Sequence, residues 1–268
     1  MTQGMLAGGV TAKLRRAATD MGSRVLTRAQ EGSPYSMRRA RGLADIQAAQ
    51  ALRFLVFNLE LNEGLESSFA TLRDEDRFDP VCDHLLVEDT RSGDIIGTYR
   101  LQTGTAAGRH LGYYSAQEFD FEPFEPFRSQ IIELGRACVH RDHRNIFVLG
   151  LLWKGIADYA REHGGRYFVG CSSLASQDPR VGASAFFELT AEHLVEPALR
   201  TFPLEAYRCD MEQLAPEVPK TPKLLRAYLS LGGKICGPPA LDREFKTIDF
   251  LTWLDLEALP PAAYRILG

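Results

Sequence analysis

Four clusters of residues in this 268-residue chain have the types and spacing for proton transfer and ion binding. They are Arg53 with Phe57 one helical turn later, the acidic run holding Asp74, Asp76 and Asp79, the single Arg100, and Glu133 with Gly135 and Arg136 followed by a basic turn. A carboxylate in an apolar setting can serve as a general base. The pattern therefore indicates acid–base chemistry on a nucleophile.

Glu133 lies among apolar residues in a segment expected to be a central strand. A buried carboxylate must be paired or have its pKa raised, and a raised pKa would suit a general base. Residues three apart on a strand point to opposite faces, so Arg136 is not expected to be its partner. Arg53 or Arg100 remains, and a structural salt bridge is the alternative to a catalytic role.

Gly135 and the basic turn at 140–144 add two further features. Glycine inside a strand often marks a bulge or a close approach to ligand, where a backbone N–H could stabilise an oxyanion, although simple packing is equally open. Arg141, His143 and Arg144 lead into a helix N-terminus, a position that binds anions. In an acyl-transfer reaction the natural anion there is a phosphopantetheine phosphate; a solvated loop is the alternative.

Hydrophobic periodicity predicts the elements that must position these residues. Helices are expected at 44–61, 146–162, 181–194 and 224–231, and strands at 84–89, 95–102, 131–140, 166–173, 234–237 and 247–256. The first two strands form an antiparallel hairpin, and the strand–helix–strand unit beginning at 131 makes its two strands parallel. The fold class is therefore α/β, a mixed twisted sheet flanked by helices on both faces.

Three regions are expected along the chain. Residues 1–40 form a basic leader, either an amphipathic interfacial helix or a disordered tail; residues 41–200 form the core; residues 201–268 add strands and a helix that complete the sheet. The long connection 103–130 is expected to be a lid or a specificity element.

Charge and composition exclude several classes of protein. Residues 1–45 carry a net charge of +5 and the remainder −9, so nucleic-acid binding is not expected, whereas the leader could contact an anionic membrane. The chain has no apolar run of about 18 residues, and a secretory signal is not expected because its first residues lack a continuous apolar stretch. Its five cysteines are scattered singly, as free thiols in a reducing compartment would be. A cytoplasmic protein, peripheral at most to the inner face of the membrane, is expected.

The order of these motifs resembles two related families. The series Arg53…Phe57, Asp74-x-Asp76-x-Phe78-Asp79, Arg100 and Glu133…Arg136 is similar to acyl-homoserine-lactone synthases. The resemblance to lyso-ornithine lipid synthases, the hemolysin-like ornithine–acyl carrier protein N-acyltransferases, is closer and covers about residues 40–256. It rests on LRFLVFNLELNEG (52–64), RDEDRFDPVCDHLLVED (73–89), GTYRL (97–101), YYSAQEFD (113–120), ELGRACVHRDHR (133–144), LLWKGIADY (151–159), GCSSL (170–174) and LLRAYLSLGGKICGPPALDREFKTIDFL (224–251).

This resemblance implies a GNAT-like fold. It also implies transfer of a long-chain (3-hydroxy)acyl group from acyl carrier protein to the α-amine of an amino acid, for which ornithine is the expected substrate. The site residues it implies fall into three groups. They are the catalytic residues Glu133, Asp76, Asp79 and Arg136, the substrate-binding residues Arg53, Phe57, Asp74, Arg100 and Gly135, and the carrier-binding residues Arg141, His143 and Arg144. Neither a metal nor a cofactor is expected, since the acyl carrier protein brings the donor.

One departure bears on the donor. The coenzyme A loop of ordinary GNAT enzymes has the form R/Q-x-x-G-x-G/A, and residues 144–148 lack its glycines, which favours a carrier-protein donor. Two other functions stay open. A homoserine lactone synthase usually has a tryptophan that residues 58–73 lack, and a non-catalytic carrier- or membrane-binding module would not need Glu133, Asp76, Asp79 and Arg136 together.

Overall fold

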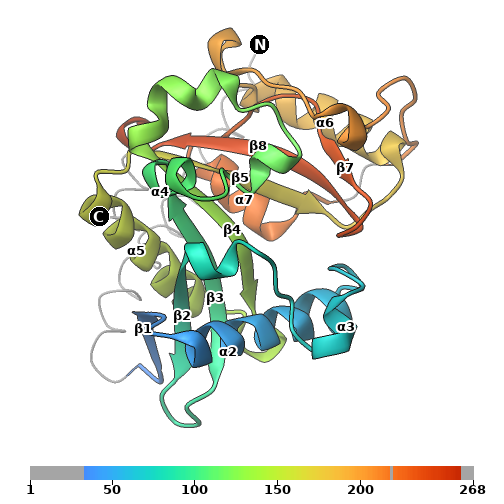
Figure 1. Ribbon diagram of the computed structural model, residues 1–268. Coiled ribbons are helices and arrows are strands. Elements are labelled where there is room, and N and C mark those ends of the chain that lie inside the picture. Colours follow the sequence, from blue (N-terminus) through green and yellow to red (C-terminus); the bar gives the residue numbers. More distant parts are fainter. Residues whose placement is uncertain (1–32, 218–219, 261–268) are drawn as a thin grey trace, which may run out of the picture.

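The computed structural model describes residues 33–217 and 220–260. One eight-stranded sheet of order β1-β2-β3-β4-β5-β8-β6 runs through this part of the chain, and β7 also pairs with β8 (Figure 1). The strands are β1 (Tyr35–Arg39), β2 (Asp83–Asp89), β3 (Ile95–Thr103), β4 (Ile131–Val139), β5 (Tyr167–Leu174), β6 (Lys234–Ile235), β7 (Ala240–Asp242) and β8 (Thr247–Asp255). Only β4 and β5 are parallel; the other pairs are antiparallel, so the predicted mixed sheet is confirmed.

Helices pack against both faces of the sheet (Figure 1). They are α2 (Leu43–Phe54), α3 (Ser68–Thr71), α4 (Gly104–Arg109), α5 (Ile146–His163), α6 (Pro179–His193) and α7 (Lys223–Ser230). The apolar side of α5, including Leu152 and Ile156, packs with Leu85 on one face. On the other face Leu52 of α2 packs with Cys138 of β4. Within the described segments no helix is long and apolar enough to cross a membrane.

Most predicted elements appear close to their expected bounds, but α3 and β7 were not predicted. Three other differences concern the leader, the long connection and the first helix. Residues 35–39 lie within the expected leader, yet they form β1 and pair with β2; residues 1–32, where the membrane contact was expected, lie outside the described part. The long connection 103–130 holds α4 and a 3-10 helix at Glu122–Gln130. Beyond Phe54 the first helix continues as a π-helical segment, Leu55–Glu60.

Strands β4 and β5 separate soon after they meet. Their pairing covers only Ile131–Glu133 against Tyr167–Val169. Gly170 follows at the last close approach, where a Cβ would overlap the carbonyl oxygen of Leu134. Beyond this point the strands diverge, and a gap opens between the middle of β4 and the end of β5.

A bulge in the β3–β4 pair lies beside this gap. The register shifts between Thr98 and Arg100, which pair with Cys138 and Gly135, so that one residue of β3 faces two of β4. Arg136, inside the bulge, has φ +49°, in the left-handed region that non-glycine residues rarely adopt. Strain of this kind concentrates at functional sites.

Candidate active site

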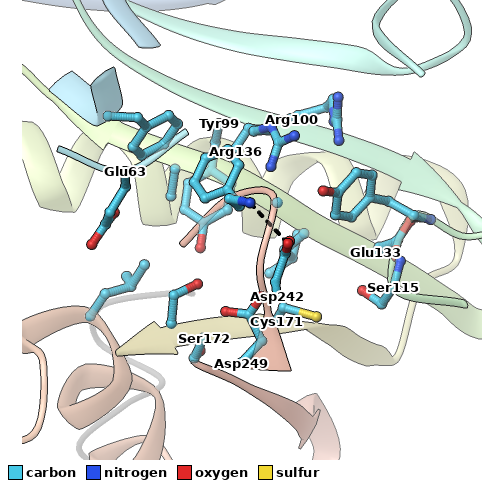
Figure 2. A pocket seen from close by; sticks show the side chains of 18 of the residues that line it. Glu63, Tyr99, Arg100, Ser115, Glu133, Arg136, Cys171, Ser172, Asp242 and Asp249 are labelled. Atoms are coloured by element: carbon cyan, nitrogen blue, oxygen red, sulfur yellow. Dashed lines mark hydrogen bonds between the residues drawn. The ribbon is translucent and has the colours of Figure 1, made fainter. Parts of the chain in front are cut away.

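A cavity of about 350 Å³ occupies the gap between β4 and β5 (Figure 2). Its apolar lining includes Phe57, Leu61, Leu134, Leu225 and Phe245. Arg100 and Arg136 lie on the side of β3 and β4, and Asp242 and Asp249 lie on the side of β7 and β8. The cavity therefore offers cationic, anionic and apolar walls to one small substrate.

The cationic wall is supported by a network of three arginines and three aspartates. Arg53 is fully buried, and it pairs with the Asp74 carboxylate at 2.9 Å and with Asp79 at 2.6 Å. Arg100 contacts Asp76 at 2.7 Å and Asp79 at 3.0 Å. Together with Arg136 of β4, these arginines give each of the three aspartates at least two cationic partners.

Arg136 completes this network from the bulge of β4. Its Nε lies 3.3 Å from Asp74 Oδ2, and its Nη2 donates to Asp76 Oδ2 at 3.2 Å. The guanidinium also stacks over the rings of Tyr114 and Phe245, at 4.7 and 4.5 Å from their centroids. Ion pairs and two aromatic faces thus fix Arg136 in the cavity wall.

The aspartate and arginine side chains in this network stay ionised. Burial alone would raise the pKa of Asp76 and of Asp79, but the arginines outweigh it and lower both pKa values below the usual range. Burial opposes the charge on Arg100 too, yet Asp76 and Asp79 raise its pKa. An aspartate that remains ionised and is bonded to arginines is a poor proton acceptor.

Four of the predicted site residues therefore lie behind the wall. Arg53, Asp74, Asp76 and Asp79 are absent from the cavity lining, and Arg53 and Asp74 have no exposed surface. The resemblance implied that Arg53 and Asp74 contact the substrate directly. Their burial does not agree with such contact, because the two side chains pair with each other and neither has exposed surface. Phe57, Arg100, Gly135 and Arg136 do line the cavity.

Glu133 has partners different from those expected. Its Oε2 accepts hydrogen bonds from Gln102 Nε2 at 2.6 Å and from the Tyr114 N–H at 2.9 Å, and its Oε1 accepts from the Ser115 N–H at 2.8 Å. The predicted pairing with Arg53 or Arg100 is wrong, because both arginines are taken up by aspartates. The carboxylate instead fixes residues 114–115 of the long connection at the cavity rim.

Glu133 and Arg136 also lie closer together than simple strand alternation predicts. Both border the cavity and both contact Tyr114, one at its N–H and the other over its ring. The bulge at Arg136 breaks the alternation, and the expectation that the two residues face opposite sides is wrong for that reason.

The three residues predicted to bind the carrier lie together before α5, but their environments differ. Arg144 makes two hydrogen bonds with Glu60, at 2.6 and 2.8 Å. His143 Nδ1 lies 3.1 Å from the Tyr35 hydroxyl. Arg141 is 71% exposed and lies only loosely near its neighbour Asp142. Arg141 is the member of this group best placed to meet an incoming partner.

The acidic wall was missed by the sequence analysis. Asp242 and Asp249 line the cavity, with Glu118 buried beside Asp249. Burial raises the pKa of Asp249 to about 6, and burial together with Asp249 raises that of Glu118 well above its usual value. The signal available was an acidic residue inside the apolar run of β8, the same signal that identified Glu133.

The comparisons with known proteins agree with this geometry. Residues 52–154 match the acetyltransferase (GNAT) domain family. Among solved structures, FeeM, an N-acyl amino acid synthase from uncultured soil microbes, superposes with a TM-score of 0.52 at 11% identity, covering 84% of this chain and 93% of its own. The fold is thus GNAT-like, as the resemblance in the sequence implied.

Relatives in sequence identify the family within the GNAT-like proteins. The chain is 35% identical over 238 residues to the L-ornithine N(alpha)-acyltransferase of Brucella abortus (strain 2308), covering 83% of this chain and 85% of the relative. It is 35% identical over 263 residues to the enzyme of that name from Rhizobium meliloti (strain 1021), covering 91% and 87%. The chain belongs to the L-ornithine N(alpha)-acyltransferase family.

Proposed function

We propose that this protein transfers a long-chain (3-hydroxy)acyl group from acyl carrier protein to the α-amine of L-ornithine, giving an N-acyl amino acid of the lyso-ornithine lipid type. The observation that carries the proposal is the cavity between β4 and β5, in which arginines and carboxylates oppose each other across an apolar floor. A free amino acid carries both charges on one small skeleton. Family membership supplies the identity of the amino acid and speaks against a homoserine lactone synthase.

The arginine side of the cavity suits the α-carboxylate of the substrate. Arg100 Nη2 is buried and has no hydrogen-bond acceptor among the described residues, although Arg100 lines the cavity. A carboxylate arriving there would receive a charge-assisted hydrogen bond. Asp76 and Asp79 then act as positioning residues that hold this guanidinium in place.

Glu133 is the proposed general base, which removes a proton from the α-ammonium directly or through a water molecule. Its three N–H donors fix the carboxylate at the cavity edge and leave lone pairs on Oε1. An α-amine has a pKa of about 8, so little driving force is needed. The free amine attacks the thioester carbonyl carbon, the C–N bond forms, the C–S bond breaks, and the departing sulfur leaves as the thiol with a proton from the nitrogen. Backbone N–H groups near Gly135 are the proposed oxyanion donors.

The N-terminus of α5 favours a carrier-protein donor over coenzyme A. The Asn145 side chain caps this helix by accepting from the N–H groups of Phe147 and Val148, at 3.0 and 3.1 Å. Those N–H groups are consequently unavailable to a pyrophosphate, and Arg144 is already paired with Glu60. A donor bound mainly through protein–protein contact has less need of them.

The donor preference is tested with purified protein, L-ornithine, and a matched pair of thioesters that carry one acyl chain on acyl carrier protein or on coenzyme A. We expect acylornithine, measured by mass spectrometry, to form with a kcat/KM at least about tenfold higher from the carrier. Equal or faster transfer from coenzyme A would contradict the proposed donor while leaving ornithine acylation standing.

Arg141 is expected to contribute to carrier binding. Because it is exposed and loosely paired, Arg141→Ala should raise the KM for acyl carrier protein about two- to fivefold and leave the KM for ornithine unchanged. The matched control is Arg180→Ala, an exposed arginine at the start of α6 that pairs with Asp178. Steady-state kinetics at low and high salt distinguish them, since only the Arg141 effect should shrink as salt is added; a carrier KM equal in both variants would remove Arg141 from the docking surface.

A further inference from the structure

The acidic wall of the cavity is not used by the chemistry described so far. It draws on three separated segments: Glu118 from the long connection, Cys171 from β5 and Asp249 from β8. One oxygen or sulfur atom from each lies within 4.8 Å of the others. Asp242, from β7, lines the same part of the cavity. Two carboxylates thus line the cavity, and that of Glu118 is buried beside Asp249.

Among the described residues, no lysine or arginine forms an ion pair with the acidic wall, although the charge of Arg136 acts on Glu118 from a greater distance. Asp249 is 4% exposed; its Oδ2 accepts from the Thr247 hydroxyl at 3.3 Å, whereas its buried Oδ1 has no hydrogen-bond partner in the described structure. Within residues 33–217 and 220–260, no Lys or Arg side chain lies within salt-bridge distance of Glu118, Asp242 or Asp249. A buried carboxylate left in this way is costly unless a ligand supplies the positive charge.

The chemistry of the group favours an alkylammonium. Burial, with Glu118 and Asp249 nearby, raises the pKa of the Cys171 thiol well above its usual value, so the sulfur stays protonated and is a weak metal ligand. An alkylammonium is compact, has three N–H donors and remains charged to a pH of about 10. The apolar residues Leu225 and Phe245, which line the same cavity, suit the methylene chain that carries such a group.

We propose that Asp249, with Asp242 and Glu118, binds the δ-ammonium of ornithine and selects an amino acid with a cationic side chain. The inference rests on the proposed function and deepens it. With the α-carboxylate at Arg100 and the δ-ammonium at Asp249, the α-amine lies between them, on the side where Glu133 borders the cavity. The acidic wall keeps the δ-amine protonated, and therefore without a lone pair to attack the thioester.

The test compares two acceptors, L-ornithine and L-norvaline, which has the same three-carbon side chain without the terminal amine. Wild type should prefer ornithine. Asp249→Asn should lower kcat/KM for ornithine about 10- to 100-fold, mainly through KM, because one charge-assisted hydrogen bond is lost. Activity with norvaline should change less than about threefold. Asp255→Asn, on the same strand but paired with Arg166 outside the cavity, is the matched control and should leave both acceptors unaffected.

Each contrary result has a distinct meaning. Equal losses with both acceptors would show that Asp249 serves the chemistry and not the side chain, which overturns the subsite alone. Loss of wild-type activity on removal of a bound divalent metal would overturn the ammonium assignment in favour of a metal. Absence of ornithine acylation by the wild type would overturn the proposed function as well. If Asp249→Asn does not fold, as judged by circular dichroism, Glu118→Gln should show the same selective loss.

Discussion

Replacing Glu133 with glutamine is expected to slow ornithine acylation about 100- to 10,000-fold at pH 7, because a positioned proton acceptor contributes a factor of that size. The loss should fall on kcat. It should also shrink as the pH is raised from 7 to 9, since the α-amine, with a pKa of about 8, then loses its proton to solvent. Single-turnover rates across this pH range are the measurement.

A purely structural Glu133 would behave differently. The carboxylate holds the N–H groups of Tyr114 and Ser115, so its loss could act only by loosening residues 114–115. In that case the deficit would be the same at every pH and would appear in KM. The matched control is Asp89→Asn, which alters a buried carboxylate of β2 that is bonded to Arg91, and its activity should equal that of wild type.

Arg136→Met should lower the free energy of unfolding by about 3 kcal/mol, the lower end of the cost of breaking a buried ion pair. Asp74, which has no exposed surface, and Asp76 would each lose one cation. Arg53 and Arg100 still pair with them, which keeps the loss from being greater. Urea unfolding at pH 7 measures the effect.

Two further variants locate the cause of that loss. Arg136→Met combined with Asp74→Asn should recover part of the stability, because the buried charge that lacks a partner is removed with it. Arg166→Met breaks a partly exposed pair with Asp255 and should cost about 1 kcal/mol or less. A loss for Arg136→Met no larger than that for Arg166→Met would contradict the proposed role of the network.

The sequence predicted the fold well where hydrophobic period was strong. Helix α5 and strands β4 and β5 have long apolar patterns, and their parallel crossover followed from the order of elements. Strand β1, with the sequence YSMRR, has no such pattern, because its register depends on pairing with β2. Short edge strands are specified by their neighbours, which a local pattern does not contain.

The sequence predicted many of the residues of the site, but not which of them pair with one another. Arg53, Asp79 and Arg100 do gather in space, but both arginines pair with the aspartate, and a list of charges does not state which charges pair. The bulge at Arg136 depends on the register between β3 and β4 and has no local signal. Glu118 and Asp249 meet only through the tertiary fold, which explains why the acidic wall was not foreseen.

The position of the new amide bond shows which of the two ornithine nitrogens the protein acylates. Purified protein is supplied with acyl carrier protein that bears a long-chain acyl group, and with ornithine labelled with ¹⁵N at the α-nitrogen alone. The product is then fragmented in a mass spectrometer. We expect the acyl fragment to carry the label, because the δ-nitrogen is held as an ammonium at Asp249 while the α-amine meets the thioester. An acyl fragment without ¹⁵N, formed at the δ-nitrogen, would contradict this expectation.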